Sequence, residues 1–147
     1  MHFGHALERV ENQFRNGQFT LHRDESINEV VSREKVPNEP GVYIVFGTDD
    51  HDWKRPLYIG KAGTLKNDGT WKGQKLRGRL KNKQHQMARR DFFITLMDTE
   101  YAEGLTFRWF VTQDQKTGTV IPALAEAELL QAYYDDCKRL PELNECA

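Results

Sequence analysis

Residues 55–63 read RPLYIGKAG, and this short stretch decides how the chain is expected to fold. Residues 57–59 have the branched and aromatic character of a β-strand. The apolar run then stops at Gly60, is followed by the cation Lys61 and reaches a second glycine at Gly63. Glycine weakens a strand and lets the backbone approach another molecule closely. We therefore expect the strand to end at Gly60 and to leave Lys61 exposed at its rim.

The rest of the chain shows helical and strand patterns on either side of this stretch. Apolar residues that recur at three- and four-residue intervals predict helices, and alternation at every second residue predicts strands. The predicted helices cover residues 2–15, 26–34, 73–88 and 122–136, and the predicted strands cover 42–46, 57–59 and 105–112. Residues 91–99 fit either a strand or a helix, of which the helix is favoured. The polar segment 47–56 is typical of a long hairpin loop. This order predicts an α/β (α+β) fold with a small antiparallel sheet flanked by helices.

Length and composition indicate a single domain over residues 1–147. A chain of 147 residues, 38% of them hydrophobic, can bury about 70% of its unfolded surface around one core. It has no apolar run near the ~20 residues of a membrane helix, and its charged start is unlike a signal peptide, so we expect a cytoplasmic protein without membrane contact. Cys137 and Cys146 form neither a disulfide framework nor a Cys/His zinc cluster, so both are expected to be ordinary thiols.

The formal net charge of −1 hides a strong division of charge along the chain. Residues 53–90 contain twelve Lys and Arg against one acid, Asp68, which gives this segment a formal charge of +11. The other residues hold nine bases and 21 acids and carry −12. A basic block of this size, interleaved with aromatic residues, favours binding to a phosphate backbone. The alternative for such a charge run is a solvated helix face.

Several short motifs follow one another in a fixed order. They are GVY at 41–43, YIGKA at 58–62, LRGR at 76–79, AEAELL at 125–130 and Asn144. This ordered set resembles the GIY-YIG endonuclease family, and YIGKA in particular is similar to the nuclease module of the bacterial excision-repair members. The resemblance covers residues 41–144 as a family-like core and leaves 1–36 outside it, as an N-terminal helical extension.

The resemblance implies a catalytic set drawn from these motifs. The implied catalytic residues are Tyr43, Tyr58, Lys61, Arg79 and Glu126, of which Glu126 is also the implied metal ligand. The family pattern points to Arg79, with Arg77 as the competing candidate, and to Glu126 over Glu128 because of its spacing from the leucines that follow. The implied structural or auxiliary residues are Gly41, Gly60 and Asn144.

These residue types suit the hydrolysis of a phosphodiester, which needs an activated water and stabilisation of charge at phosphorus. Side chains on one face of paired strands stand about 5 Å apart, so Tyr43 and Tyr58 can flank one phosphate. A phenol needs a cation or metal-bound water beside it to act as a base, and Lys61 is three residues from Tyr58. Arg79 offers a charged fork to phosphate oxygens, and Glu126 offers one hard oxygen to Mg²⁺ or Mn²⁺. The sequence leaves two roles open for Lys61, that of the base and that of a phosphate contact.

Together the resemblance and the charge distribution predict a Mg²⁺-dependent DNA endonuclease that acts on duplex DNA in preference to RNA. The residues expected to line the DNA path are Lys75, Arg77, Lys81, Lys83, Arg89 and Arg90. Residues 64–75 form an insertion with turn signals at 67–69 and with Trp71, and such a loop is expected to serve substrate choice. The alternatives are a non-catalytic nucleic-acid-binding module on the same fold and a protein-interaction domain for acidic partners.

Overall fold

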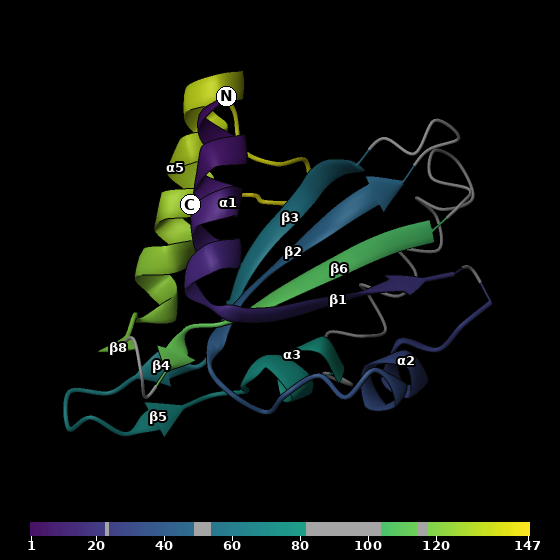
Figure 1. The fold of residues 1–147 in the computed structure, drawn as a ribbon, viewed down its shortest axis with the longest axis vertical. Helices are drawn as coiled ribbons and strands as arrows, with labels where there is room; N and C mark the ends of the chain where they lie inside the picture. Colours follow the sequence, from purple (N-terminus) through teal and green to yellow (C-terminus); the bar gives the residue numbers. More distant parts are fainter. Residues whose placement is uncertain (23, 49–53, 82–103, 115–117) are drawn as a thin grey trace.

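The computed structural model describes residues 1–22, 24–48, 54–81, 104–114 and 118–147 (Figure 1). They form an α+β fold around a four-stranded antiparallel sheet in the order β1-β6-β2-β3. The strands are β1 (Arg15–Leu21), β2 (Gly41–Thr48), β3 (Lys54–Ala62) and β6 (Gly104–Val111). The predicted fold class, an antiparallel sheet flanked by helices, is confirmed.

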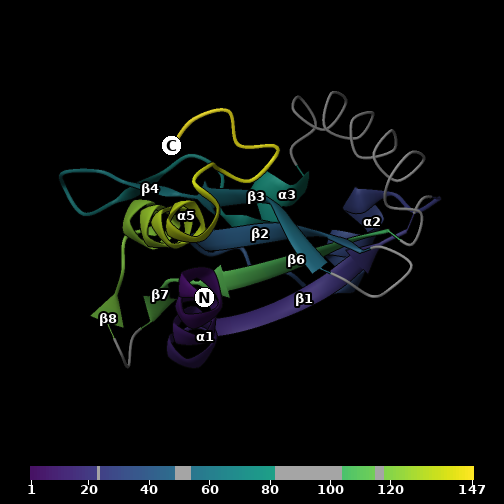
Figure 2. The same ribbon diagram turned by 90° about the horizontal axis from the view of Figure 1, so that it is seen from above.

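Helices pack on both faces of this sheet. They are α1 (His2–Gln13), α2 (Ile27–Arg33), α3 (Leu76–Lys81) and α5 (Pro122–Cys137). Figures 1 and 2 show α1 running alongside α5 on one face, and α2 and α3 on the other. Two short hairpins, β4 (Thr64–Leu65) with β5 (Trp71–Lys72) and β7 (Gln113–Asp114) with β8 (Gly118–Thr119), lie near the first turn of α5.

The central strand β2 contributes side chains to two hydrophobic cores. Tyr43 and Val45 point to the core under α2 and α3, whereas Val42, Ile44 and Phe46 point to the core under α1 and α5. This division follows from the two-residue repeat of a strand. Because both faces of the sheet are covered, every position of the VYIVF run is buried, which explains why it is apolar throughout.

The C-terminal helix agrees closely with its sequence pattern. α5 begins at Pro122, a residue that suits the first turn of a helix, and it ends at Cys137, one residue beyond the predicted end. Within the described ranges, no helix is both long enough and apolar enough to cross a bilayer.

Strand β3 is longer than its predicted apolar run and does not end at Gly60. It continues to Ala62, and Gly60 pairs with Tyr43 inside the β2–β3 ladder. Hydrogen bonds of a ladder join backbone groups whatever the side chains, so polar residues on both sides of the apolar run can be included. The break comes instead at Gly63, whose φ of 87° is in the left-handed region.

The predicted N-terminal helical extension, residues 1–36, also contains a strand that the sequence patterns did not predict, β1. This strand pairs antiparallel with β6 along its whole length, from Arg15 opposite Val111 to Leu21 opposite Leu105. Its sequence gives a weak strand signal because it is an edge strand on which only Phe19 and Leu21 are buried. Pairing with β6, a strand far away in the sequence, determines its conformation.

The basic helix α3 begins at Leu76, three residues later than predicted. The β5 strand ends just before Gly73, whose φ of 78° is incompatible with a regular helix. The insertion that precedes α3 contains the β4–β5 hairpin, which the turn signals alone did not predict. The predicted helical residues 82–88, the predicted helix over 91–99 and the loop residues 49–53 lie outside the described residues.

Candidate functional site

Two tyrosine rings cover Gly60 on the face of the sheet that carries α3. Tyr43, which is buried, pairs with Gly60, and the half-buried Tyr58 pairs with Val45, so the tyrosines are diagonal neighbours. Their ring centroids are 5.8 Å apart and their planes are inclined at 41°. A Cβ at Gly60 would lie 2.6 Å from a ring carbon of Tyr58 and 2.8 Å from Tyr43 Oη. The predicted shared face is confirmed, and glycine at this position is required to accommodate both rings.

Lys61 lies on the opposite face of β3 from Tyr58. The register between β2 and β3 is regular from Tyr58 to Lys61, and successive residues of a strand point to opposite faces. A separation of three residues therefore places Lys61 on the side of Ile59, which belongs to the core under α5. The expectation that Lys61 assists the Tyr58 phenol as a neighbour is wrong, and its charge acts instead on Glu126 of α5.

Glu126 lies in the early part of α5, which packs against β3. Burial raises the pKa of the Glu126 carboxyl above its ordinary value, and the positive charges of Lys61 and Arg79 act in the opposite direction. These two cations come from β3 and from α3, on different sides of the sheet. The structure thus brings Glu126, Lys61 and Arg79 together around the edge strand of the sheet.

The two arginines of the LRGR motif have different surroundings. Arg77 Nε donates a hydrogen bond to the carbonyl oxygen of Val36 at 2.8 Å, which ties α3 to the segment after α2. Arg79 Nε is buried and has no hydrogen-bond partner among the described residues. Because Arg79 also acts electrostatically on Glu126, it is the arginine of this motif that belongs to the candidate site.

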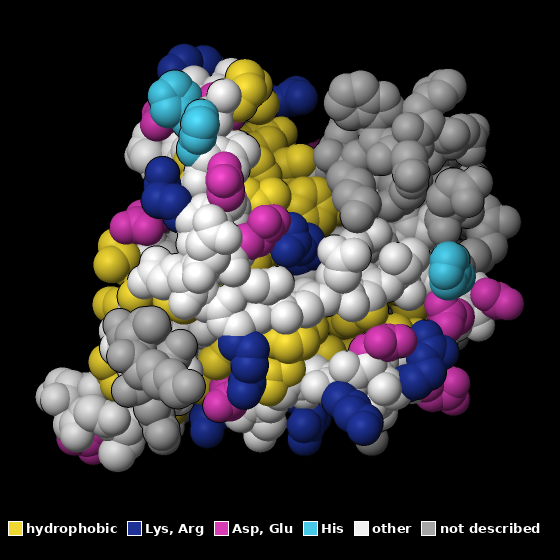
Figure 3. All heavy atoms as spheres, in the orientation of Figure 1, with side chains coloured by type: hydrophobic (Ala, Val, Ile, Leu, Met, Phe, Trp, Pro, Cys, Tyr) yellow, Lys and Arg dark blue, Asp and Glu magenta, His cyan; other side chains and the backbone are white. Residues whose placement is uncertain are grey.

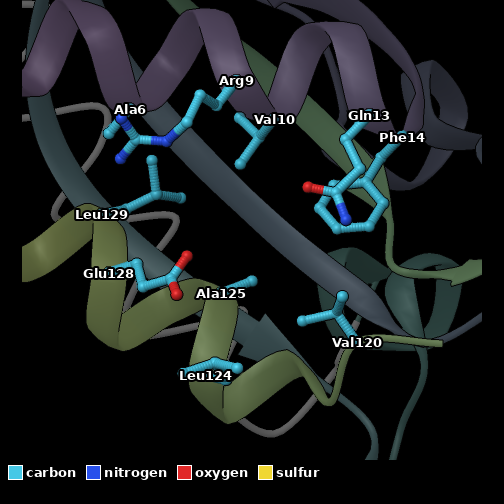
Figure 4. Close-up of a pocket in the computed structure, with 10 residues that line it drawn as sticks. All are labelled: Ala6, Arg9, Val10, Gln13, Phe14, Val120, Leu124, Ala125, Glu128 and Leu129. Atoms are coloured by element: carbon cyan, nitrogen blue, oxygen red, sulfur yellow. The ribbon is translucent and has the colours of Figure 1, made fainter.

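Glu128 is only two residues from Glu126 but faces a different part of the molecule. Two residues along an α-helix are separated by ~200° around its axis. The exposed Glu128 lines a cavity of about 130 Å³ between α1 and α5, together with Arg9 and Gln13 of α1 (Figure 4). The choice of Glu126 over Glu128 therefore agrees with the geometry of α5.

The C-terminal segment is fastened to the free edge of β3. The side chain of Asn144 accepts a hydrogen bond from Ile59 N at 2.9 Å and donates one to Ile59 O at 2.9 Å, and Leu143 N donates to Leu57 O at 2.8 Å. These bonds cover backbone groups that an edge strand leaves unpaired. Sequence reasoning identified Asn144 as auxiliary but missed its partner, because a contact across 85 residues leaves no local signal.

Gly41 lies where β2 closely approaches both β6 and the first side chain of α3. A Cβ at Gly41 would lie 2.0 Å from the carbonyl oxygen of Phe110 and 2.9 Å from Leu76 Cδ1. Leu76, the first residue of α3, is fully buried and donates its N–H to the carbonyl oxygen of Glu39 at 3.0 Å. A larger residue at position 41 would force β2 away from the Phe110 carbonyl of β6 and would press on the Leu76 side chain at the start of α3.

The predicted DNA-binding residues are only partly described. Lys83, Arg89 and Arg90 lie outside the described residues. Lys75 is half-buried just before α3, and Lys81 Nζ donates a hydrogen bond to Ser32 Oγ of α2. Figure 3 shows Lys and Arg side chains along the lower margin of the molecule, where α2 and α3 lie in Figure 1. The described members of the predicted DNA path, Lys75, Arg77 and Lys81, therefore lie in or next to α3, the helix that also carries Arg79.

Among the described residues of the candidate site, the carboxylate available to a metal ion is that of Glu126. Within the described ranges, no three His, Cys, Asp or Glu side chains form a metal-binding group. Mg²⁺ commonly keeps several waters and uses one or two carboxylates together with phosphate oxygens of the substrate. Glu126 fits such a role chemically, since its oxygen is hard and the neighbouring cations favour its ionised form.

Comparison with known proteins does not assign a family to the chain. No protein-family model, no curated protein and no solved structure matches it. A function can therefore be inferred only from the motifs and from the arrangement of the side chains.

Proposed function

We propose that this protein is a Mg²⁺-dependent DNA endonuclease of the GIY-YIG type. The observation that supports this best is the environment of Glu126, a carboxyl with a raised pKa that lies within the fields of Lys61 and Arg79. A carboxyl whose ionised form is disfavoured by burial, with specific cations beside it, is a feature of catalytic sites. The order of the GVY, YIGKA and LRGR motifs supports the same assignment.

In this proposal the cations hold the scissile phosphate. Arg79 retains unused hydrogen-bonding capacity, since its Nε has no partner among the described residues, and its planar guanidinium suits phosphate oxygens. Lys61 acts as a phosphate contact, because its place on the α5 face of β3 separates it from the Tyr58 phenol. Both charges stabilise the negative charge that develops on the phosphate oxygens during attack.

Tyr58 is the proposed proton acceptor. Before the attack the Tyr58 phenol releases its own proton to solvent, so that it can act as a base. The attacking water forms a bond to phosphorus and gives a proton to the Tyr58 phenolate oxygen, while the bond from phosphorus to the leaving oxygen breaks and that oxygen takes up a proton from solvent. Tyr58 is half-buried, whereas Tyr43 is 1% exposed, so Tyr58 is the more accessible of the two rings. Tyr43 and Gly60 orient the Tyr58 ring.

Glu126 is the proposed ligand of the metal ion. When bound, Mg²⁺ supplies charge stabilisation and lowers the pKa of the water that it holds. The carboxylate must be ionised to serve as a ligand, and the cations Lys61 and Arg79 lower the cost of ionising a partly buried acid.

The test is cleavage of supercoiled plasmid DNA with Mg²⁺ or Mn²⁺ and with the metal removed by a chelator. The proposal expects nicked or linear product only with metal. A non-catalytic binding module on the same fold would bind DNA, with a log–log salt slope of about −0.9 per phosphate neutralised, and leave it uncut. Absence of DNA binding even at low salt would contradict both functions and favour a protein partner.

A further inference from the structure

The β4–β5 hairpin, residues 64–72, projects from the molecule directly beside the candidate site. It begins at Thr64, three residues after Lys61. Figures 1 and 2 show it extending away from the sheet and from α5. Leu65 pairs across the hairpin with Trp71. We call residues 64–72 the arm.

Hydrogen bonds within the arm give it a defined shape. Lys66 N donates to Thr70 O at 2.7 Å, and Gly69 N donates to Lys66 O at 3.0 Å. Asp68 Oδ1 accepts bonds from Thr70 N at 2.9 Å and from Thr70 Oγ1 at 2.6 Å, and these bonds lower the pKa of the Asp68 carboxyl. The other carboxylate oxygen, Asp68 Oδ2, lies 4.0 Å from Lys66 Nζ in an exposed ion pair. Because exposed ion pairs are weak, the solvent-exposed side chains of Lys66 and Lys72 can still bind a phosphate.

The arm also exposes apolar surface that contributes little to the fold. Leu65 is 41% exposed and Trp71 is partly exposed. Among the described residues, the two hydrophobic cores and the side chains packed against them include neither of these residues. Leu65 and Trp71 share one face of a projecting hairpin, and Lys72, the residue after Trp71, lies on the other face. An exposed aromatic and aliphatic pair with cations nearby is a surface suited to binding.

We propose that the arm binds DNA next to the cut and that Trp71 stacks on a base that is unpaired there. This inference rests on the proposed function. Lys66 and Lys72 neutralise phosphates of the DNA backbone beside the arm, and Leu65 supports the indole from the opposite strand of the arm. Stacking on an aromatic ring requires a base face that intact duplex does not offer, so the arm favours DNA with unpaired or bulged bases.

The experiment measures the affinity of the protein, without metal, for two labelled duplexes that differ only in a bulge of unpaired bases. Wild type should bind the bulged duplex more tightly. Trp71→Ala should lose about tenfold in affinity for the bulged duplex and change little on the paired one, because the lost stacking requires an unpaired base. Trp71→Phe should retain most of the preference.

Tyr134→Ala is the matched control, since Tyr134 is also an exposed aromatic, 46% exposed, with a cation, Lys138 Nζ, 5.7 Å from its ring centroid. It should bind both duplexes as wild type does. The double variant Lys66→Ala/Lys72→Ala should reduce the salt slope by about 1.8, at about 0.9 per phosphate contact, while Lys138→Ala should leave the slope unchanged.

Three outcomes overturn the inference: equal binding of both duplexes by wild type, an unchanged preference in Trp71→Ala, or equal losses by Trp71→Ala on both duplexes. Thermal unfolding of Trp71→Ala shows whether an equal loss comes from the fold. Each of these results leaves the proposed function intact if plasmid is still cut with metal. A wild-type protein that neither binds nor cuts DNA removes both the function and the arm's role.

Discussion

Helix α5 carries two acids whose environments are opposite, and the contrast separates the candidate site from the scaffold. Toward the end of the helix, Asp136 accepts hydrogen bonds from the backbone N–H groups of His2 and Phe3 at 2.9 Å each. His2 Nδ1 also lies 2.9 Å from Asp136 Oδ1. These bonds, led by the one from Phe3, lower the pKa of the Asp136 carboxyl to about 2. Near the start of the helix, burial raises the pKa of Glu126.

Ionisation of the two acids therefore affects the stability of the fold in opposite directions. The fold favours the charged form of Asp136, which caps the first turn of α1 where Met1 provides no side-chain cap. The fold penalises the charged form of Glu126 and leaves two cations beside it. The side of α5 that faces α1 therefore contributes to stability, whereas the side that faces β3 holds a carboxyl whose ionisation is opposed by burial. Perturbed carboxyls of this kind are common in functional sites.

The strongest test of this contrast is Glu126→Gln. We expect cleavage to fall by about 10³-fold, because the variant loses its charged metal ligand and the electrostatic support of the reaction. DNA affinity measured without metal should stay close to that of wild type. Glu128→Gln, two residues away on the cavity side, is the matched control and should cut normally. Full activity of Glu126→Gln would remove Glu126 from the site.

The next test concerns the tyrosine pair. Tyr58→Phe keeps the ring over Gly60 but removes the proposed proton acceptor, so single-turnover cleavage should fall by about 10²-fold, the lower part of the range for loss of a general base. We expect the lower part because Lys61 lies on the other face of β3 and does not assist the phenol. The comparison with Tyr43→Phe across pH 6–10 controls for packing. Losses below tenfold for both variants would exclude a tyrosine base.

A smaller effect is expected where the C-terminal segment meets β3. Asn144→Ala removes two hydrogen bonds to Ile59, each worth about 0.5–1.5 kcal/mol, so the free energy of unfolding should fall by about 1–3 kcal/mol. Urea unfolding measures this loss, and Glu145→Ala at the exposed neighbouring position is the control. An unchanged unfolding free energy would mean that this segment does not hold the edge of β3.

The smallest effect is a difference in the pH dependence of stability. The Asp136 carboxyl has a lowered pKa, so its stabilisation is present above the ordinary value of 3.8 and is lost as the pH falls through about 2. Asp136→Asn should therefore lower Tm by a few degrees near neutral pH, and the deficit should shrink as the pH falls from 4 toward 2.

Glu126→Gln should act with the opposite sign. Because the pKa of this carboxyl is raised, the native state loses stability as the pH rises above the ordinary value of 4.5, and a neutral glutamine avoids that loss. Its Tm should be slightly higher than that of wild type at neutral pH and equal to it in acid. A lower Tm at neutral pH would show that the charged form of Glu126 stabilises the fold. That result would contradict the proposed difference between Glu126 and Asp136.

Local sequence patterns predicted the elements that carry their own periodicity. The apolar repeat of α5, the alternation in β6 and the apolar run of β2 each specified an element to within about two residues at either end. The same patterns failed for β1, which has only two buried residues, and for the outer parts of β3, where polar residues belong to the ladder. An edge strand exposes most of its side chains, so its apolar signal is weak.

The site shows the same division. The sequence by itself determined the residue types, the spacing that places the two tyrosines on one face, and the separation of basic from acidic segments, because these follow from the repeat of a strand and from composition. Only the tertiary structure decided that Glu126 meets the charges of Lys61 and Arg79 around the edge of β3, and that Asn144 closes that edge. Such contacts join residues far apart in the chain, and burial and electrostatic fields arise only when packing has brought them together.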